Sequence, residues 1–145
     1  MTAMEYVVEA LGGMSLFRVA TVPSSDEMRE RIKRGLPYRS LESVRERLQL
    51  TMPEAASLLQ MPARTLARRK QTRKLQPDES DRLYRLARMA AHAVDVFGSD
   101  EKATAWLRRP NRALNGEQPI RLLDTDLGAR QVEDLLGRLD YGIAG

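Results

Sequence analysis

Two short helical segments that meet at a tight break constrain the fold of this chain more than any other feature of its sequence. Residues 52–59 predict a short helix with the small residues Ala55 and Ala56 on one side. The break Gln60-Met61-Pro62 follows, and a second short helix is expected directly after it. Two short helices joined by a tight turn form a helix-turn-helix, whose second helix enters the DNA major groove. Residues 57–74 therefore predict a helical bundle with a nucleic-acid-binding face.

The second of these helices is strongly basic. Between Ala63 and Pro77 the chain carries six positive side chains and no acidic one. A charge run is usually only the solvated face of a helix, but the lack of interleaved acids and the position after the break favour DNA contact. Leu66 is expected to point inward and to hold the helix on the bundle.

The basic helix divides into two sets of expected contacts. Residues near its start face base edges, where an arginine can pair bidentately with guanine. The later cations contact phosphates, which adds salt-dependent affinity without sequence choice. The expected base-facing residues are Ala63, Arg64, Thr65 and Arg68, and the expected phosphate contacts are Arg69, Lys70, Arg73 and Lys74.

The turn between the two helices departs from the usual pattern of the motif. Gln60 stands where the chain is expected to turn left-handed, a conformation that favours glycine and costs other residues about 1 kcal/mol. Pro62 also occupies the position where a serine or threonine would cap the second helix.

Helical periodicity extends through the rest of the chain. Ser40 is expected to cap a helix that ends at Gln49, and a long helix is expected from residue 77 to residue 97. Residues 14–22 are compatible with either strand or helix, but no segment alternates convincingly at a period of two. We expect an all-α fold with an N-terminal helical extension at 1–39, a helix-turn-helix region at 40–76 and a C-terminal helical domain at 77–145. The extension is interpreted as a dimer contact or as a brace.

Composition argues against several classes of function. The net charge of +4 makes the basic run a local patch, and the chain has no cysteine and a single histidine, His92. Without a glycine-rich phosphate loop, these residues leave little for catalysis, so we expect neither an enzyme nor a bound cofactor or metal. The absence of a membrane-spanning apolar run or a signal pattern favours a cytoplasmic protein that does not bind membranes.

From Leu36 onward, about three quarters of the chain resembles the Xre/MbcA/ParS-type antitoxins of bacterial toxin–antitoxin pairs. The resemblance begins with residues 64–69 (RTLARR) and 75–83 (LQPDESDRL). It continues through 97–98 (FG), 105–107 (AWL), 110–111 (PN), 113–116 (ALNG), Pro119, 122–125 (LLDT), 128–130 (GAR), 132–138 (VEDLLGR) and 141–143 (YGI). The departures are Gln60 at the turn, Asn115 where a glycine often precedes Gly116, and the Ala144-Gly145 end.

The resemblance implies a helix-turn-helix (Xre/Cro-like) bundle followed by a small helical toxin-binding domain. It implies a homodimer that binds an inverted-repeat operator and thereby represses its own operon. It also implies a cognate RES-domain toxin that consumes NAD, whose active-site cleft is blocked by the C-terminal end of the antitoxin. Carried onto this chain, the toxin-binding residues are Trp106, Pro110, Asn111, Leu114, Asp140, Tyr141, Gly142 and Ile143.

The residues are compatible with this interpretation. From Arg121 onward the chain holds five acidic against three basic side chains, a balance that suits a cationic pocket better than DNA. The alternative is a stand-alone dimeric helix-turn-helix regulator whose C-terminal half only dimerises. Growth rescue by co-expression with a neighbouring toxin would distinguish the two.

Overall fold

The computed structural model describes residues 1–140 and residue 142, and over these residues the fold is entirely helical, as the sequence predicts. Within this part of the chain there are nine α-helices and two 3₁₀-helices. In chain order they are α1 (Ala3–Ala10), α2 (Met14–Phe17), α3 (Ser25–Arg34), α4 (Tyr38–Leu48), α5 (Met52–Leu58), α6 (Ala63–Thr72), α7 (Pro77–Phe97), α8 (Asp100–Arg108), η1 (Arg112–Leu114), η2 (Pro119–Asp124) and α9 (Asp126–Asp140).

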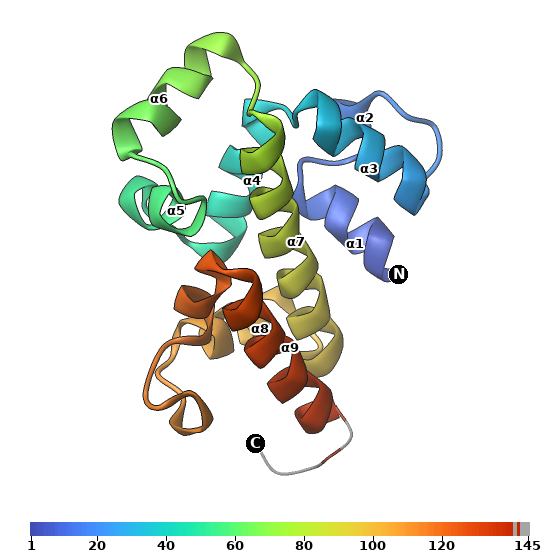
Figure 1. Ribbon diagram of the computed structural model, residues 1–145. Coiled ribbons are helices and arrows are strands. Elements are labelled where there is room, and N and C mark those ends of the chain that lie inside the picture. The colour runs from blue at the N-terminus through green and yellow to red at the C-terminus, as the bar shows by residue number, and fades with distance from the viewer. Residues whose placement is uncertain (141, 143–145) are drawn as a thin grey trace.

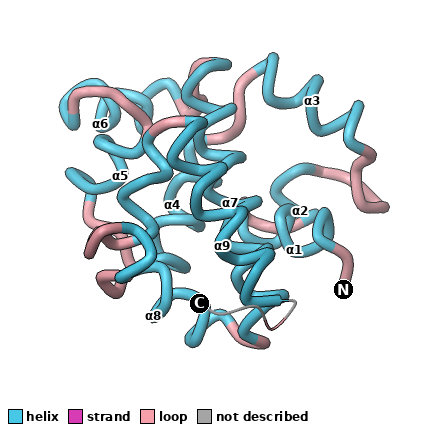
Figure 2. The backbone as a smooth tube through the Cα atoms, turned by 60° about the horizontal axis from the view of Figure 1, so that its bottom comes forward, coloured by secondary structure: helices cyan, strands magenta, loops and turns pink. Residues whose placement is uncertain are grey.

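The long helix α7 is the axis on which the other helices pack (Figure 1). Helices α1, α3 and α4 contact it on the N-terminal side of the fold, and α8 and α9 contact it on the C-terminal side. Figure 2 shows α9 lying along α7. Buried residues on α7 include Leu83, Leu86 and Met89, so apolar side chains point in several directions from the helix. The buried apolar residues of the described chain therefore form one continuous hydrophobic core.

Local caps set where most of the helices begin. Thr51 and Glu54 form a reciprocal capping box at α5, and Gly98 ends α7 in the left-handed conformation with φ of 90°. The prediction that Ser40 caps α4 is wrong: Pro37 is the N-cap, and Ser40 is buried one turn inside the helix. The reason is tertiary, because the Tyr38 amide donates to the Arg73 carbonyl at 3.0 Å and fixes the chain before the helix.

The N-terminal helix α1 is packed into the core rather than projecting from it. Val7, Val8 and Leu11 are buried, and α1 lies against both α7 and α4. The Tyr6 hydroxyl donates to the Asp100 carboxylate, and Arg47 contacts the same carboxylate at 3.1 Å. Burial, with the Asp100 hydrogen bond, raises the pKa of Tyr6 to about 12. These contacts join α1 to α4 and α8.

The basic helix α6 is held on α7 by a bidentate ion pair. Arg69 donates from Nε and Nη2 to the two carboxylate oxygens of Glu79, each at 2.9 Å. The Glu79 side chain is 7% exposed, and it also accepts the Gln76 amide at 2.8 Å as part of the α7 capping box. Because Glu79 is buried, removing its cation leaves a charge without a partner, which is costlier than losing a surface pair.

None of the described helices combines the length and the apolar character needed to cross a membrane.

Two glycines of α9 give a matched test of how tightly this helix packs. A Cβ at Gly128 would lie 2.0 Å from the Leu122 carbonyl oxygen, whereas a Cβ at Gly137 would meet nothing within 4 Å. Gly128→Ala is expected to lower the free energy of unfolding by about 1–3 kcal/mol, because η2 must move. Gly137→Ala is expected to raise it by about 0.5–1 kcal/mol through helix propensity. Chemical denaturation of both variants checks this, and equal effects would contradict the close packing.

Adjacent arginines of α6 give a second matched pair. Arg69→Gln is expected to lower the free energy of unfolding by about 1–3 kcal/mol, because Glu79 loses its charged partner. Arg68→Gln, which removes an exposed side chain, is expected to change it by about 0.5 kcal/mol or less. Thermal and urea unfolding at neutral pH measure both, and a similar loss in the two variants would refute the role of the Arg69–Glu79 pair.

Candidate nucleic-acid and protein interfaces

The turn before α6 has the geometry expected of a helix-turn-helix. Gln60 adopts the left-handed conformation with φ of 56°, and Pro62 is the N-cap of α6 without a side-chain hydrogen bond. Leu66 is fully buried and anchors the helix, and Leu75 is buried where the chain leaves it. The predictions from the sequence for Gln60, Pro62 and Leu66 are confirmed.

The predicted base-facing residues lie on the outer side of α6. Ala63, Arg64 and Arg68 are exposed, and Thr65 is half-buried. The Arg68 guanidinium approaches the Thr65 hydroxyl at 3.5 Å. Within the described part of the chain, neither Arg64 nor Arg68 forms an ion pair, so both guanidinium groups are open to a ligand.

The predicted phosphate contacts differ from one another. Lys70, Arg73 and Lys74 are exposed and without an ion pair among the described residues, whereas the Arg69 side chain is 19% exposed and bound to Glu79. The hydrogen bonds to Glu79 raise the pKa of Arg69. Arg69 therefore holds α6 in place. Arg69 is three residues after the buried Leu66, so both lie on the same face of α6. This spacing is the sequence signal that could have distinguished Arg69 from the exposed cations.

At the other end of the molecule, the predicted partner-binding residues of α8 and the following loop lie close together. Trp106 is half-buried and packs on Phe97, with ring centroids 5.3 Å apart. The loop after α8 is closed by Asn111, whose amide donates to the Glu117 carbonyl at 3.0 Å. Pro110 is exposed on this loop, and Leu114 is half-buried against the core. The hydrogen bond at Asn111 and the packing of Leu114 thus fix the conformation of this loop.

The predicted C-terminal contacts are only partly within the described chain. Asp140 is the exposed last residue of α9, and Gly142 is exposed with φ of 72°. The other two predicted contacts, Tyr141 and Ile143, lie outside the described residues.

Helix α7 separates the two candidate surfaces. Glu79, which binds Arg69, lies in its first turn, and Phe97, which packs on Trp106, is its last residue. At a rise of about 1.5 Å per residue, these two positions are about 27 Å apart along the helix. Figure 1 shows α6 at one end of the molecule and the C-terminal end of α9 at the other.

Polar contacts join the helix-turn-helix to the C-terminal helices at the middle of the molecule. The Arg108 guanidinium binds Glu54 of α5 at 2.8 Å, and the Gln60 side-chain amide donates to the Asp124 carbonyl. The Thr51 amide and the Arg108 guanidinium hold the pKa of Glu54 below its usual range. These contacts fix the position of α5 and its turn relative to η2.

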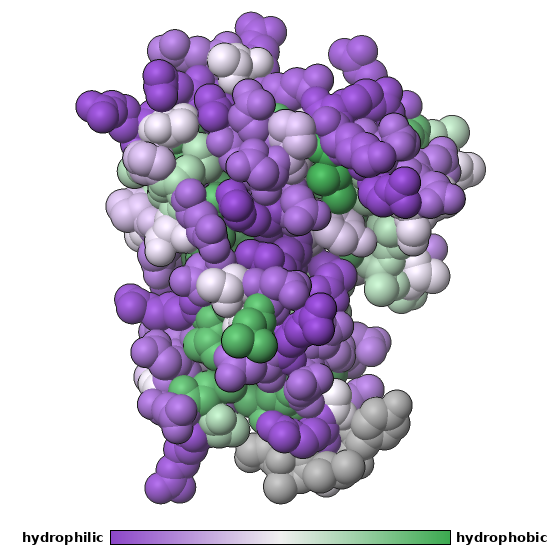
Figure 3. Space-filling model, in the orientation of Figure 1, coloured by the Kyte–Doolittle hydropathy of each residue, from purple (hydrophilic) through white to green (hydrophobic). Residues whose placement is uncertain are grey.

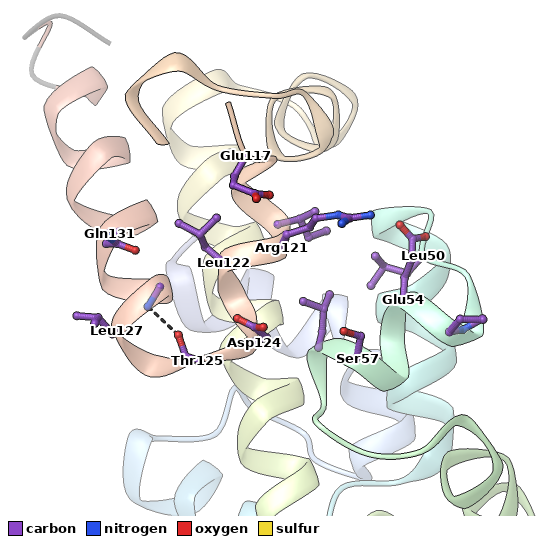
Figure 4. Close-up of a pocket in the computed structure, with 14 residues that line it drawn as sticks. Leu50, Glu54, Ser57, Glu117, Arg121, Leu122, Asp124, Thr125, Leu127 and Gln131 are labelled. Carbon is purple, nitrogen blue, oxygen red and sulfur yellow. Dashed lines mark hydrogen bonds between the residues drawn. The ribbon is translucent and has the colours of Figure 1, made fainter. Parts of the chain in front are cut away.

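Between these contacts lies a groove of about 660 Å³, which the sequence did not predict. It runs between α5 on one side and η2 with the start of α9 on the other (Figure 4). Leu127 stands at its edge with 71% of its surface exposed, and Figure 3 shows hydrophobic residues gathered on this face. Leu127 is an apolar residue outside the buried stripe of α9. This position is the sign of the groove that the sequence carries.

Family models match both halves of the chain. Residues 27–88 match the antitoxin Xre-like helix-turn-helix domain, which begins within α3 and ends within α7. Residues 92–142 match the antitoxin Xre/MbcA/ParS C-terminal toxin-binding domain.

Individual relatives agree with these models. An antitoxin Xre from Yersinia enterocolitica is 33% identical over 133 residues, covering 89% of this chain and 90% of the relative. An antitoxin Xre from Pseudomonas putida is 36% identical over 129 residues, covering 88% and 80%. A chain in the crystal structure of the M. tuberculosis MbcT–MbcA toxin–antitoxin complex superposes with a TM-score of 0.54 at 25% identity, covering 74% of this chain and 96% of that one.

Both halves of the chain thus match consecutive domains of one kind of protein, and relatives more than 30% identical align along most of their length. The chain belongs to the antitoxin Xre family and is an antitoxin of a toxin–antitoxin system.

Proposed function

We propose that this antitoxin binds the operator of its own operon through α6 and neutralises a RES-type, NAD-consuming toxin through its C-terminal end. The two activities use surfaces at opposite ends of one helical body. Substitutions on one surface are therefore expected to remove one activity and to leave the other intact.

The observation that carries operator binding is the contrast between neighbouring arginines on α6. Arg69 is bound to Glu79, while Arg64 and Arg68 are exposed and pair with no acidic side chain among the described residues. Unpaired guanidinium groups at the start of the second helix of a helix-turn-helix are placed to read guanine in the major groove. A homodimer would present two such helices about 34 Å apart, which matches an inverted repeat spaced by one DNA turn.

The toxin-binding half of the proposal is supported by the family model over residues 92–142, whose description is a toxin-binding domain. MbcA, the structural relative, was solved in complex with its toxin MbcT. In this chain, Asp140 and Gly142 follow the last buried turn of α9 and are exposed, so this end can enter a cleft without unfolding the core. Trp106 and the loop carrying Pro110, Asn111 and Leu114 form the adjoining contact surface.

Arg64→Ala combined with Arg68→Ala is expected to reduce operator affinity to that for an unrelated duplex, because the variant can no longer pair bidentately with guanine. Fluorescence anisotropy with operator DNA at physiological salt measures this, and toxin neutralisation should be unchanged. Lys102→Ala with Arg130→Ala removes the same charge from exposed positions on α8 and α9 and should leave operator affinity unchanged. Normal operator binding by the α6 variant would exclude α6 as the recognition helix.

Deletion of residues 140–145 is expected to abolish toxin neutralisation and to leave operator binding intact, since α9 keeps its buried residues up to Leu136. Growth rescue on co-expression with the cognate toxin and the rate of NAD consumption by the purified toxin report neutralisation. Operator binding by the truncated chain shows that it is folded. Full inhibition of the toxin by the truncated chain would rule out the blocking role of this end.

A further inference from the structure

The C-terminal end of α3 lies against the chain that leaves α6, although the two are about 40 residues apart in sequence. The Leu75 amide donates to the Leu36 carbonyl at 2.9 Å, and the Tyr38 amide donates to the Arg73 carbonyl at 3.0 Å. A Cβ at Gly35 would lie 2.2 Å from the Leu75 carbonyl oxygen and 3.2 Å from carbons of the Lys74 side chain. The end of α3 is therefore fixed beside the last basic residues of α6.

This packing joins two groups of cations into one surface. Lys33 and Arg34, the basic end of α3, are exposed, and so are Arg73 and Lys74. Of the four, only Lys33 has an ion-pair partner among the described residues, Glu30 at 3.7 Å, and both side chains of that pair are about 60% exposed. In Figure 1, α3 and α6 both lie at the end of the molecule away from the last turn of α9, and Figure 3 shows mostly hydrophilic residues at that end.

Cations at the end of a helix have a local explanation, because they interact favourably with the helix dipole. That explanation covers Lys33 and Arg34 separately, but not their placement beside Arg73 and Lys74. Like charges held together repel one another, and the repulsion is relieved when a polyanion binds. We call these four cations on two neighbouring elements the basic strip, and such a group of cations indicates an extended anionic ligand.

The dimensions of duplex DNA fit this strip. Helix α6 has 10 residues and is about 15 Å long, and the major groove is about 12 Å wide. With the start of α6 over base edges, the chain leaving it at Arg73 and Lys74 reaches the sugar–phosphate backbone. The backbone carries a charge for about every 1.7 Å of duplex, so the next phosphates lie within reach of a neighbouring basic element.

We infer that the basic end of α3 binds the DNA backbone next to the site read by α6 and extends the phosphate-binding surface beyond α5 and α6. This inference rests on the proposed operator function and adds a second element to the same interface. The α3 cations contribute affinity that depends on salt and does not depend on base sequence.

The test is the salt dependence of DNA affinity for the full-length chain carrying Lys33→Gln and Arg34→Gln. Anisotropy titrations with the operator and with an unrelated duplex of equal length, from about 50 to 200 mM salt, give the slope of log affinity against log salt. The slope is expected to become shallower by about 0.9 for each phosphate that the variant no longer neutralises. The ratio of wild-type to variant affinity is therefore expected to fall by about threefold for each such phosphate as the salt rises from about 50 to 200 mM. The fall should be the same for the operator and for the unrelated duplex.

Lys102→Gln with Arg130→Gln is the matched control, because it removes the same charge from exposed positions on α8 and α9. Its slope should equal that of wild type. Thermal melts of both double variants verify folding. If wild type binds its operator and the α3 variant shows the slope and affinity of the control, the inference is overturned while operator binding stands. Failure of wild type to bind any operator fragment would overturn both.

Discussion

Burial of α7 on several of its sides is the interaction on which the rest of this antitoxin depends. Leu83 and Leu86 on this helix are fully buried, and helices from both halves of the chain pack on it. Because most of the stability of a helix in a protein comes from such packing, the elements that carry the two proposed binding surfaces share one core. Their relative position is therefore fixed by one rigid element, with Arg69–Glu79 at its start and Phe97–Trp106 at its end.

Much of this architecture could be predicted from the sequence, because it depends on local signals. Capping at Thr51, the left-handed turn at Gln60 and the end of α7 at Gly98 each depend on a few adjacent residues. The start of α4 could not be predicted, because hydrogen bonds with residues 73–75 override the local signal at Ser40. The expected binding residues on α6 and in the loop after α8 lie together on two surfaces, and their binding roles remain predictions.

Features that depend on distant parts of the chain were out of reach of sequence reasoning. Arg68 and Arg69 are adjacent and chemically identical. The three-residue spacing from Leu66 indicates that Arg69 lies on the packed side of α6, but the partner that binds it, Glu79, is known only from the folded chain. The same holds for the groove between α5 and η2, which exists because Glu54 and Gln60 bind side chain and backbone groups more than 50 residues away.

Helix α7 runs through both matched domains, and this has a consequence for how the binding specificities of such antitoxins can change in evolution. Within the described chain, α7 runs without a break from the helix-turn-helix domain into the C-terminal domain, so a hybrid made by joining halves of two relatives would place mismatched side chains around α7. Exposed positions such as Arg64 and Arg68 are free of that restriction. New operator or toxin specificities are therefore reached more readily by point changes on the two outer surfaces than by recombination of whole segments.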